Sequence, residues 1–149
     1  MNDKTAPVFV IATANDITAL PPECSRKGRW DELFYVNMPD AADRESIWNV
    51  QLRNFKRDPD KFDTAELARI TDGFTGAEIA ACVSEAITRA FDEGSEIDDI
   101  MLAAAVADTI PLSKTMAAEL EHMQQWAKGR CRPASKKRDV SSGARKVAV

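Results

Sequence analysis

The sequence predicts a mainly α-helical chain that begins with two short strands of a sheet. Residues 7–15, "PVFVIATAN", are almost continuously apolar and β-branched, which is typical of a strand covered on both faces of a parallel sheet. Residues 33–38, "LFYVNM", form a second short apolar run that stops at Pro39. From residue 40 to about residue 129 the apolar side chains recur with the period of a helix, so helices should make up most of the fold.

The helical region is expected to contain five segments. Asp40 and Asp63 precede the first two as N-caps, and Glu66 follows Asp63 at the spacing of a capping box. Gly94 ends the third segment, and Pro111 separates the last two. The expected segments are residues 40–55, 63–71, 75–91, 97–110 and 115–129.

Two strands do not make a sheet that is stable alone. We therefore expect the chain to be the C-terminal piece of a larger protein, with the rest of the sheet upstream of Met1. The expected organisation is a sheet part at 1–39, a helical domain at 40–113, a C-terminal helix at 114–129 and a basic disordered tail at 130–149.

The composition of the 149 residues, 44% hydrophobic and 30% charged, is that of a globular protein and excludes several classes. No apolar run approaches the roughly 20 residues that a membrane helix needs, and there is no basic-then-apolar leader, so we expect no membrane association. The three cysteines form no CxxC pair, which argues against a disulfide framework or a metal site and fits the cytoplasm.

Charge is distributed unevenly along the chain. The net charge is −4, yet residues 128–149 hold eight Lys or Arg and one Asp. Such a basic end can contact nucleic acid or an acidic surface, but it can equally serve only solubility. It carries no interleaved aromatic residues, which weakens the nucleic-acid interpretation.

Three stretches of the chain match a known family. The stretches "VFVIATAND" and "LPPECSRKGRWDELFYVNMPD" resemble the second region of homology of the AAA clade of AAA+ ATPases, and "TDGFTGAEIAACVSEAITRA" resembles the signature of their lid domain. The signatures occur in the family's order and cover roughly residues 7–92. The variant "LPPE…RKGRWDE" and the ending "TIPLSKTM…WAKGRCRPAS" are most similar to uncharacterised AAA ATPases of cyanobacteria, plastids and other bacteria. The resemblance implies that the two strands end an α/β P-loop NTPase sheet and that the helices form the AAA+ lid.

The resemblance assigns catalytic roles to three residues. Asn15, at the carboxyl end of the first expected strand, matches sensor 1, which contacts the γ-phosphate or orients the attacking water; the alternative is a cap of the strand-to-loop turn. Arg26 and Arg29 match the two arginine fingers, which reach the nucleotide of the neighbouring subunit, with Arg26 favoured for γ-phosphate contact. A solvated basic loop is the alternative for these arginines. Lys27 and Trp30 replace the Pro and Phe that the family usually has there, so the loop is expected to be slightly freer while an aromatic side chain is kept.

The lid signature also implies nucleotide-contacting residues. Thr75, Gly76 and Ala77 open the third helical segment, where family members place a Gly-Ala turn against the adenine and ribose. An ordinary N-cap and tight packing is the alternative. Positions 77 and 78 are Ala and Glu, so no sensor-2 arginine is present.

The sequence contains no G-x-x-x-x-G-K-(S/T) and no apolar strand ending in Asp-Glu. ATP with Mg²⁺ is therefore expected to be bound mainly by residues outside this chain, upstream of Met1, and the chain alone should not hydrolyse ATP.

Together the resemblances imply part of an ATPase that acts in a homo-oligomeric ring, a hexamer by the family pattern, and remodels a protein substrate in the cytoplasm or the plastid stroma. The alternative is a protein- or nucleic-acid-interaction module of a degenerate AAA protein that no longer hydrolyses ATP. Retention of Asn15, Arg26 and Arg29 favours the ATPase.

Overall fold

A computed structural model describes residues 8–16, 21 and 30–135 of the chain. The chain divides into two compact units. Residues 38–121 form a helical unit, and residues 1–37 together with 122–149 form the other.

The five helical segments expected from the sequence are all present, with two short additions. The helices are α1 (Ala41–Asn54), α2 (Thr64–Ile70), α3 (Gly76–Glu93), α4 (Asp99–Asp108), α5 (Leu112–Thr115) and α6 (Ala117–Ala127), and a 3₁₀ turn, η2 (Pro59–Lys61), precedes α2. The 3₁₀ turn and the four-residue α5 are too short to produce a periodic pattern in the sequence.

Side-chain caps explain where the longer helices begin. The Asp40 side chain accepts a hydrogen bond from the amide of Asp43 at 2.8 Å, and Asp63 accepts one from Glu66 at 2.9 Å. At the other end of α3, Gly94 has a φ of +67°, the left-handed conformation that commonly ends a helix. Both aspartate caps and the glycine stop were predicted correctly from the sequence.

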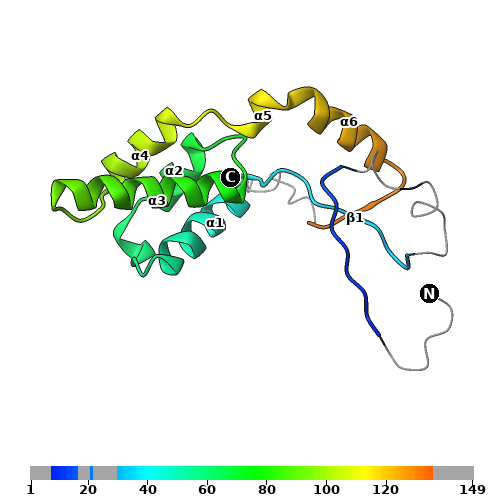
Figure 1. Ribbon diagram of the computed structural model, residues 1–149, viewed down its shortest axis with the longest axis horizontal. Coiled ribbons are helices and arrows are strands. Elements are labelled where there is room, and N and C mark those ends of the chain that lie inside the picture. Colours follow the sequence, from blue (N-terminus) through cyan, green and yellow to red (C-terminus); the bar gives the residue numbers. More distant parts are fainter. Residues whose placement is uncertain (1–7, 17–20, 22–29, 136–149) are drawn as a thin grey trace, which may run out of the picture. The chain divides into compact units, whose positions relative to one another are not determined.

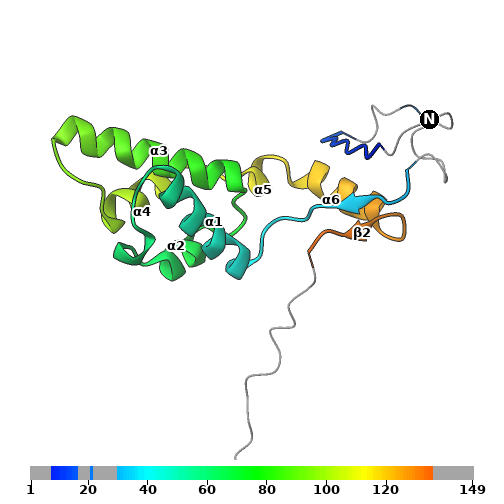
Figure 2. The same ribbon diagram turned by 90° about the horizontal axis from the view of Figure 1, so that it is seen from below.

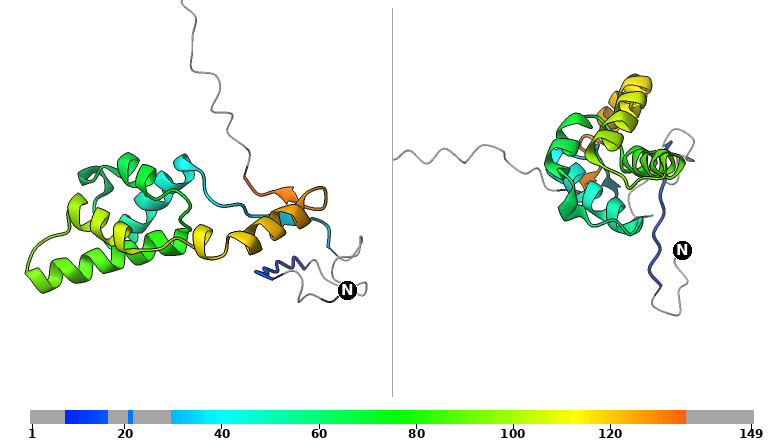
Figure 3. Two further views of the ribbon diagram at one scale, coloured as in Figure 1. Left: turned by 90° about the horizontal axis from the view of Figure 1, so that it is seen from above. Right: turned by 90° about the vertical axis from the view of Figure 1, so that its left-hand side faces the viewer.

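Helix α3 is the longest helix of the helical unit. Figure 1 shows it between α1 and α4, and Figure 2 shows that α1, α2 and α4 all lie on one side of it. The right panel of Figure 3, which views α3 end-on, shows the same arrangement. One stripe of α3 is accordingly buried, whereas Phe91, on the opposite face, is 82% exposed. The core consists of Trp48, Leu52, Leu67, Ala68, Phe74, Ile79, Cys82, Val83, Ala86, Ala90, Ile97, Leu102, Ala105 and Val106.

A buried arginine joins α1 to α2. Arg44 is 6% exposed; its Nε donates to the carbonyl of Ala68 at 3.0 Å and its guanidinium also donates to the carbonyl of Pro39 at 2.9 Å. A third nitrogen forms an ion pair of 3.1 Å with Asp72, which is itself exposed. The arginine thereby satisfies backbone carbonyls at the end of α2 and just before α1.

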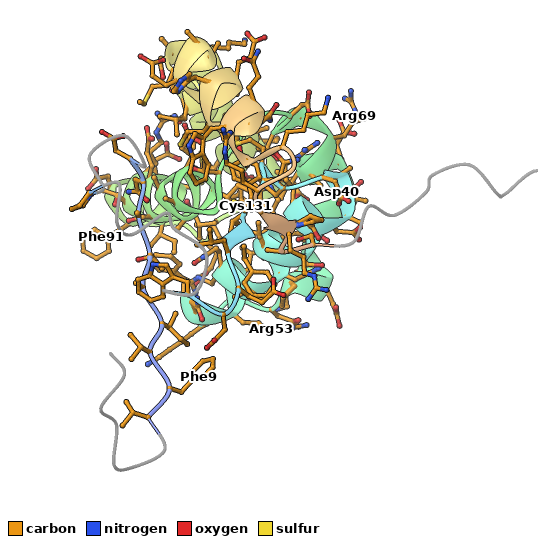
Figure 4. All side chains as sticks on the ribbon, turned by 90° about the vertical axis from the view of Figure 1, so that its right-hand side faces the viewer. Phe9, Asp40, Arg53, Arg69, Phe91 and Cys131 are labelled. Atoms are coloured by element: carbon orange, nitrogen blue, oxygen red, sulfur yellow. The ribbon has the colours of Figure 1, made fainter. Side chains whose placement is uncertain are left out.

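The second unit contains a two-stranded parallel sheet, but the two strands are not the two that the sequence predicts. Strand β1 (Phe34–Tyr35) lies within the expected strand at 33–38 and pairs with β2 (Arg132–Pro133). Residues 8–16 form no strand, and Phe9 is 87% exposed, as its outward side chain in Figure 4 shows. The prediction of a strand at 7–15 is therefore wrong for its described part, because an apolar run becomes a strand only when a neighbouring strand completes its hydrogen bonds.

Strand β2 lies in the range 130–149, where the sequence shows no element. Gly129, with a φ of +75°, follows α6 and turns the chain back toward β1. The amide of Arg132 then donates to the carbonyl of Leu33 at 2.8 Å, and that of Ala134 to Tyr35 at 2.9 Å. Two residues of pairing leave no recognisable alternation in the sequence.

The predicted fold class is confirmed: the chain is mainly helical, with a two-stranded sheet remnant. Within the described ranges no single helix is long and apolar enough to cross a membrane, and one bent pair, Asp99–Thr115 with Ala117–Ala127, meets that test by length and composition alone.

Candidate functional site

The three residues expected to face the nucleotide in the lid lie together at the start of α3. Thr75 is the N-cap, and Gly76 and Ala77 are the first two residues of the helix. The hydroxyl of Thr75 accepts a hydrogen bond from the amide of Glu78 at 3.3 Å. The carboxylate of Glu78 in turn accepts from the amide of Thr75 at 2.7 Å and from its hydroxyl at 2.8 Å, which completes a capping box.

The amides at this helix start are available to a ligand. Among the residues that the structure describes, none accepts a hydrogen bond from the amides of Gly76 or Ala77. Thr75 and Gly76 are half-buried and Ala77 is exposed. The N-terminus of an 18-residue helix therefore presents free N–H groups beside two very small residues, an arrangement that suits an anionic or polar ligand.

Gly76 is not required by the packing of the unit. A Cβ atom added at this position would lie 3.8 Å from the side chain of Ile47, which is ordinary van der Waals contact. Gly73 differs, because its φ is +77° and an added Cβ would lie 2.2 Å from the hydroxyl oxygen of Ser113. The glycine before the helix serves the fold, whereas the glycine at its first position leaves a space that the fold does not use.

Glu78 also reaches a segment far along the chain. While its Oε2 closes the capping box, its Oε1 accepts a hydrogen bond of 2.6 Å from the amide of Leu112, the first residue of α5. One helical turn further along α3, the sulfur of Cys82 lies 3.6 Å from the hydroxyl of Thr109. Together with the close approach of Ser113 to Gly73, these contacts hold residues 109–113 against the start of α3.

Cys82 is a structural thiol. It is completely buried, and that burial raises its pKa above the ordinary cysteine value. A thiol with a raised pKa holds little thiolate at neutral pH, so Cys82 is not a nucleophile.

Two open pockets of the helical unit lie away from the helix start. One is bordered by Phe74, Val106 and Lys114, and the other by Arg44, Ala65 and Arg69. Neither is lined by Thr75, Gly76 or Ala77. A ligand at the helix start would therefore rest on the surface of this unit and depend on other parts of a protein for the rest of its contacts.

Of the three catalytic residues expected from the sequence, the structure describes Asn15, which belongs to the other unit. Asn15 is exposed and lies at a bend that follows residues 8–14. Arg26 and Arg29 lie outside the described residues. In the part of the chain that the structure covers, no group of three or more His, Cys, Asp or Glu side chains could hold a metal ion.

Sequence reasoning missed Glu78 as a part of this site. The spacing Thr-x-x-Glu at 75–78 is a recognisable capping-box signal. Its bond to Leu112 had no such signal, because the two residues are 34 positions apart and meet only through the packing of α3 and α5.

Comparison with known proteins identifies the class of domain to which this helix start belongs. Residues 61–101 match the family model of the AAA+ lid domain. The match includes all of α2 and α3 and the beginning of α4.

Relatives match over more of the chain. The chain is 41% identical over 142 residues to the uncharacterized AAA domain-containing protein ycf46 of Trieres chinensis and 40% identical over 137 residues to that of Pyropia yezoensis. These matches cover 93% and 91% of this chain but 28% of each relative. The ATP-dependent zinc metalloprotease FtsH 2 of Bdellovibrio bacteriovorus is 38% identical over 84 residues, which are 56% of this chain and 14% of that protein.

These similarities confirm the resemblance seen in the sequence. The chain contains an AAA+ lid domain at residues 61–101, and over more than nine tenths of its length it is similar to AAA domain-containing proteins. It spans little more than a quarter of the length of the ycf46 proteins that it matches.

Proposed function

We propose that this chain supplies the sensor-1 residue, the arginine fingers and the nucleotide lid of a ring-forming AAA ATPase that couples ATP hydrolysis to the remodelling of a protein substrate. The observation that carries the proposal is the start of α3. There, free amides and two small residues form a surface that packing within the chain does not require. The match to the AAA+ lid domain supports the expectation that this surface faces ATP with its Mg²⁺.

In this proposal the lid binds and orients the base and sugar of the nucleotide. The amides of Gly76 and Ala77 and the positive end of the α3 dipole favour the polar atoms of the ligand. The absence of a side chain at Gly76 lets the ligand approach the backbone closely. The phosphates and Mg²⁺ are held outside this chain, because it contains no phosphate-binding loop.

The proposed catalytic residues act at two different nucleotides. Asn15 serves the nucleotide of its own subunit by orienting the attacking water or contacting the γ-phosphate. Arg26 and Arg29 serve the nucleotide of the neighbouring subunit, where a permanently charged, planar guanidinium stabilises the charge of the departing phosphoryl group. Assembly of a homo-oligomeric ring, hexameric in the family pattern, is then a requirement for turnover. The chain would work in the cytoplasm or in a plastid stroma.

The trans-acting role can be tested with Arg26→Ala in the full-length protein. We expect hydrolysis to fall by about a thousandfold or more, since arginine fingers contribute on that scale, while the affinity for ATP changes little. Turnover by malachite green assay and affinity by fluorescent-nucleotide titration measure the two quantities separately.

A mixing experiment distinguishes action in trans from damage in cis. Subunits carrying Arg26→Ala, mixed with subunits that have an inactive phosphate-binding loop but an intact finger, should regain part of the activity. Lys27→Ala is the matched control, because it removes a neighbouring charge that has no proposed role. Loss of ATP binding in Arg26→Ala, or no recovery on mixing, would contradict the proposal.

A further inference from the structure

We propose that Glu78 is a positioning residue that holds the nucleotide-facing turn of α3 in place by anchoring it to the amide of Leu112. The inference rests on the proposed nucleotide contact at Thr75–Ala77. It proposes that residues 109–113, which have no proposed contact with the nucleotide, support that contact.

The two carboxylate oxygens of Glu78 serve two different elements. Oε2 accepts from the amide and the hydroxyl of Thr75, at 2.7 and 2.8 Å, and so fixes the residue directly before Gly76. Oε1 accepts from the amide of Leu112 at 2.6 Å. Hydrogen bonds to a charged carboxylate are stronger than those between neutral groups, so this one side chain links the first turn of α3 firmly to the first residue of α5.

A capping box alone does not need a glutamate with this reach. In α1 the same position is occupied by Asp43, which closes the box to the amide of its N-cap, Asp40, at 3.4 Å. In α2 the corresponding residue, Glu66, pairs with Arg69 on its own helix. Of the three, Glu78 is the one that extends to an amide on another element.

The segment that receives Glu78 is held at two further points. Ser113 lies so close to Gly73 that its hydroxyl would have to move to admit a Cβ there, and the hydroxyl of Thr109 lies 3.6 Å from the sulfur of Cys82. Residues 109–113 are therefore anchored on both sides of Leu112. A segment fixed at three points can act as a rigid support for the turn that bears Gly76 and Ala77, because displacement of the turn would break the bonds to Leu112 and Thr75 together.

The substitution Glu78→Asp separates capping from support. The shorter side chain can still close the box, as Asp43 does in α1, but it lacks the length to reach Leu112 as well. Glu66→Asp is the matched control, since it makes the same change at the same helix position where no bridge to another element exists.

Hydrogen exchange on the 149-residue chain tests the physical link. In Glu78→Asp the amide of Leu112 should exchange about fivefold faster or more, whereas the amide of Thr75 should keep most of its protection. Glu66→Asp should change neither. Unchanged exchange at Leu112 would overturn the proposed anchor.

Steady-state kinetics of the full-length ATPase tests the consequence. Glu78→Asp should raise the KM for ATP by about threefold to tenfold with kcat changed less than about twofold, because the turn is misplaced for binding while the catalytic residues are untouched. Glu66→Asp should leave both constants unchanged. A merely structural role would lower the thermal midpoint without this separation of KM from kcat, and such a result would overturn the inference.

Failure of the proposed Glu78 support can be distinguished from failure of the proposed nucleotide contact. If Thr75–Ala77 does not bind nucleotide, enlarging Gly76 will leave KM unchanged although exchange at Leu112 still responds to Glu78→Asp. If only the support is wrong, enlarging Gly76 will raise KM and Glu78→Asp will not.

Discussion

Two glycines three residues apart are under different constraints. At Gly73 a side chain would be strained by the positive φ of +77° and would displace the Ser113 hydroxyl, so the residue is explained by the fold. At Gly76 the backbone is helical and the nearest atoms to an added Cβ, those of Ile47, lie at 3.8 Å. Stability alone would favour alanine at Gly76, because glycine is a poor helix former. Under the proposed nucleotide contact, the choice of glycine lets a ligand approach the backbone at this position.

This contrast predicts opposite effects of Gly76→Ala on stability and on binding. The free energy of unfolding of the chain should stay the same or rise by up to about 1 kcal/mol, since alanine restricts the unfolded chain and fits the helix. In the full-length protein the KM for ATP should rise by about fivefold or more, because the methyl group occupies space needed by the ligand. Urea unfolding and ATPase kinetics measure the two effects.

Gly94→Ala provides the control for this prediction. Its φ of +67° lies in the left-handed region, and no atom lies within 4 Å of an added Cβ. It should lower stability by about 1 kcal/mol through backbone strain and leave KM unchanged. A Gly76→Ala protein with normal KM would mean that the space at the helix start is not used by nucleotide.

At the scale of elements, the joint between α1 and α2 depends on one buried cation. Arg44 donates to the carbonyls of Ala68 and Pro39 and pairs with Asp72. Replacing it with methionine keeps most of the packing volume but leaves two carbonyls without their charged donor. We expect Arg44→Met to lower the free energy of unfolding by about 2 to 3 kcal/mol, read from urea denaturation followed by helical circular dichroism.

Arg69→Met is the comparison for this loss. Arg69 forms a solvent-exposed pair with Glu66 on the same helix surface, and such exposed pairs contribute little to stability. When Arg69 is removed, the carboxylate of Glu66 is solvated by water, so no buried group is left without a partner. If the two substitutions lowered the free energy of unfolding equally, the burial of Arg44 would not be the reason that its hydrogen bonds stabilise the fold.

The elements also show which parts of the fold could be predicted and why. Helices α1 to α4 were predictable because their caps and stripes, such as Asp40, Asp63 and Gly94, are local in sequence. The three residues at the start of α3 were likewise predictable, from a family signature together with a local capping pattern. The bond from Glu78 to Leu112 and the pairing of β1 with β2 were not, because they depend on residues that meet only after packing.

The apolar segment at residues 8–16 shows that a local pattern can also predict an element that the structure lacks. Its composition is that of a central strand, and Val8, Phe9, Val10 and Ile11 are all exposed. An isolated apolar segment cannot satisfy its backbone groups by itself, so its pattern predicts a strand only within a complete sheet. Asn15, near the end of this segment, should likewise need a complete sheet to take a defined position.

At the scale of the whole molecule, the basic end of the chain has one part that the structure describes, residues 130–135, and one part outside the described residues. Residues 132–134 hydrogen-bond to Leu33 and Tyr35, and the side chain of Arg132 lies 3.4 Å from that of Glu32. Residues 136–149 lie outside the described structure and contain five Lys or Arg and one Asp. Truncation experiments should therefore compare a chain that ends after residue 135 with one that ends after residue 129.

We predict that removing residues 136–149 from the full-length protein leaves its ATPase activity within about twofold of normal, since an end that serves only solubility takes no part in binding or catalysis.

Removing residues 130–149 should be more harmful. It deletes β2, frees the hydrogen-bonding edge of β1 and exposes the carbonyls of Leu33 and Tyr35, in the same unit as Asn15. We expect protection of the β1 amides from hydrogen exchange to fall and ATPase activity to fall with it. A loss of activity on removing residues 136–149 alone would instead assign the basic end a direct role in the ATPase, and a filter-binding assay with single-stranded nucleic acid would then test whether that role is nucleic-acid contact.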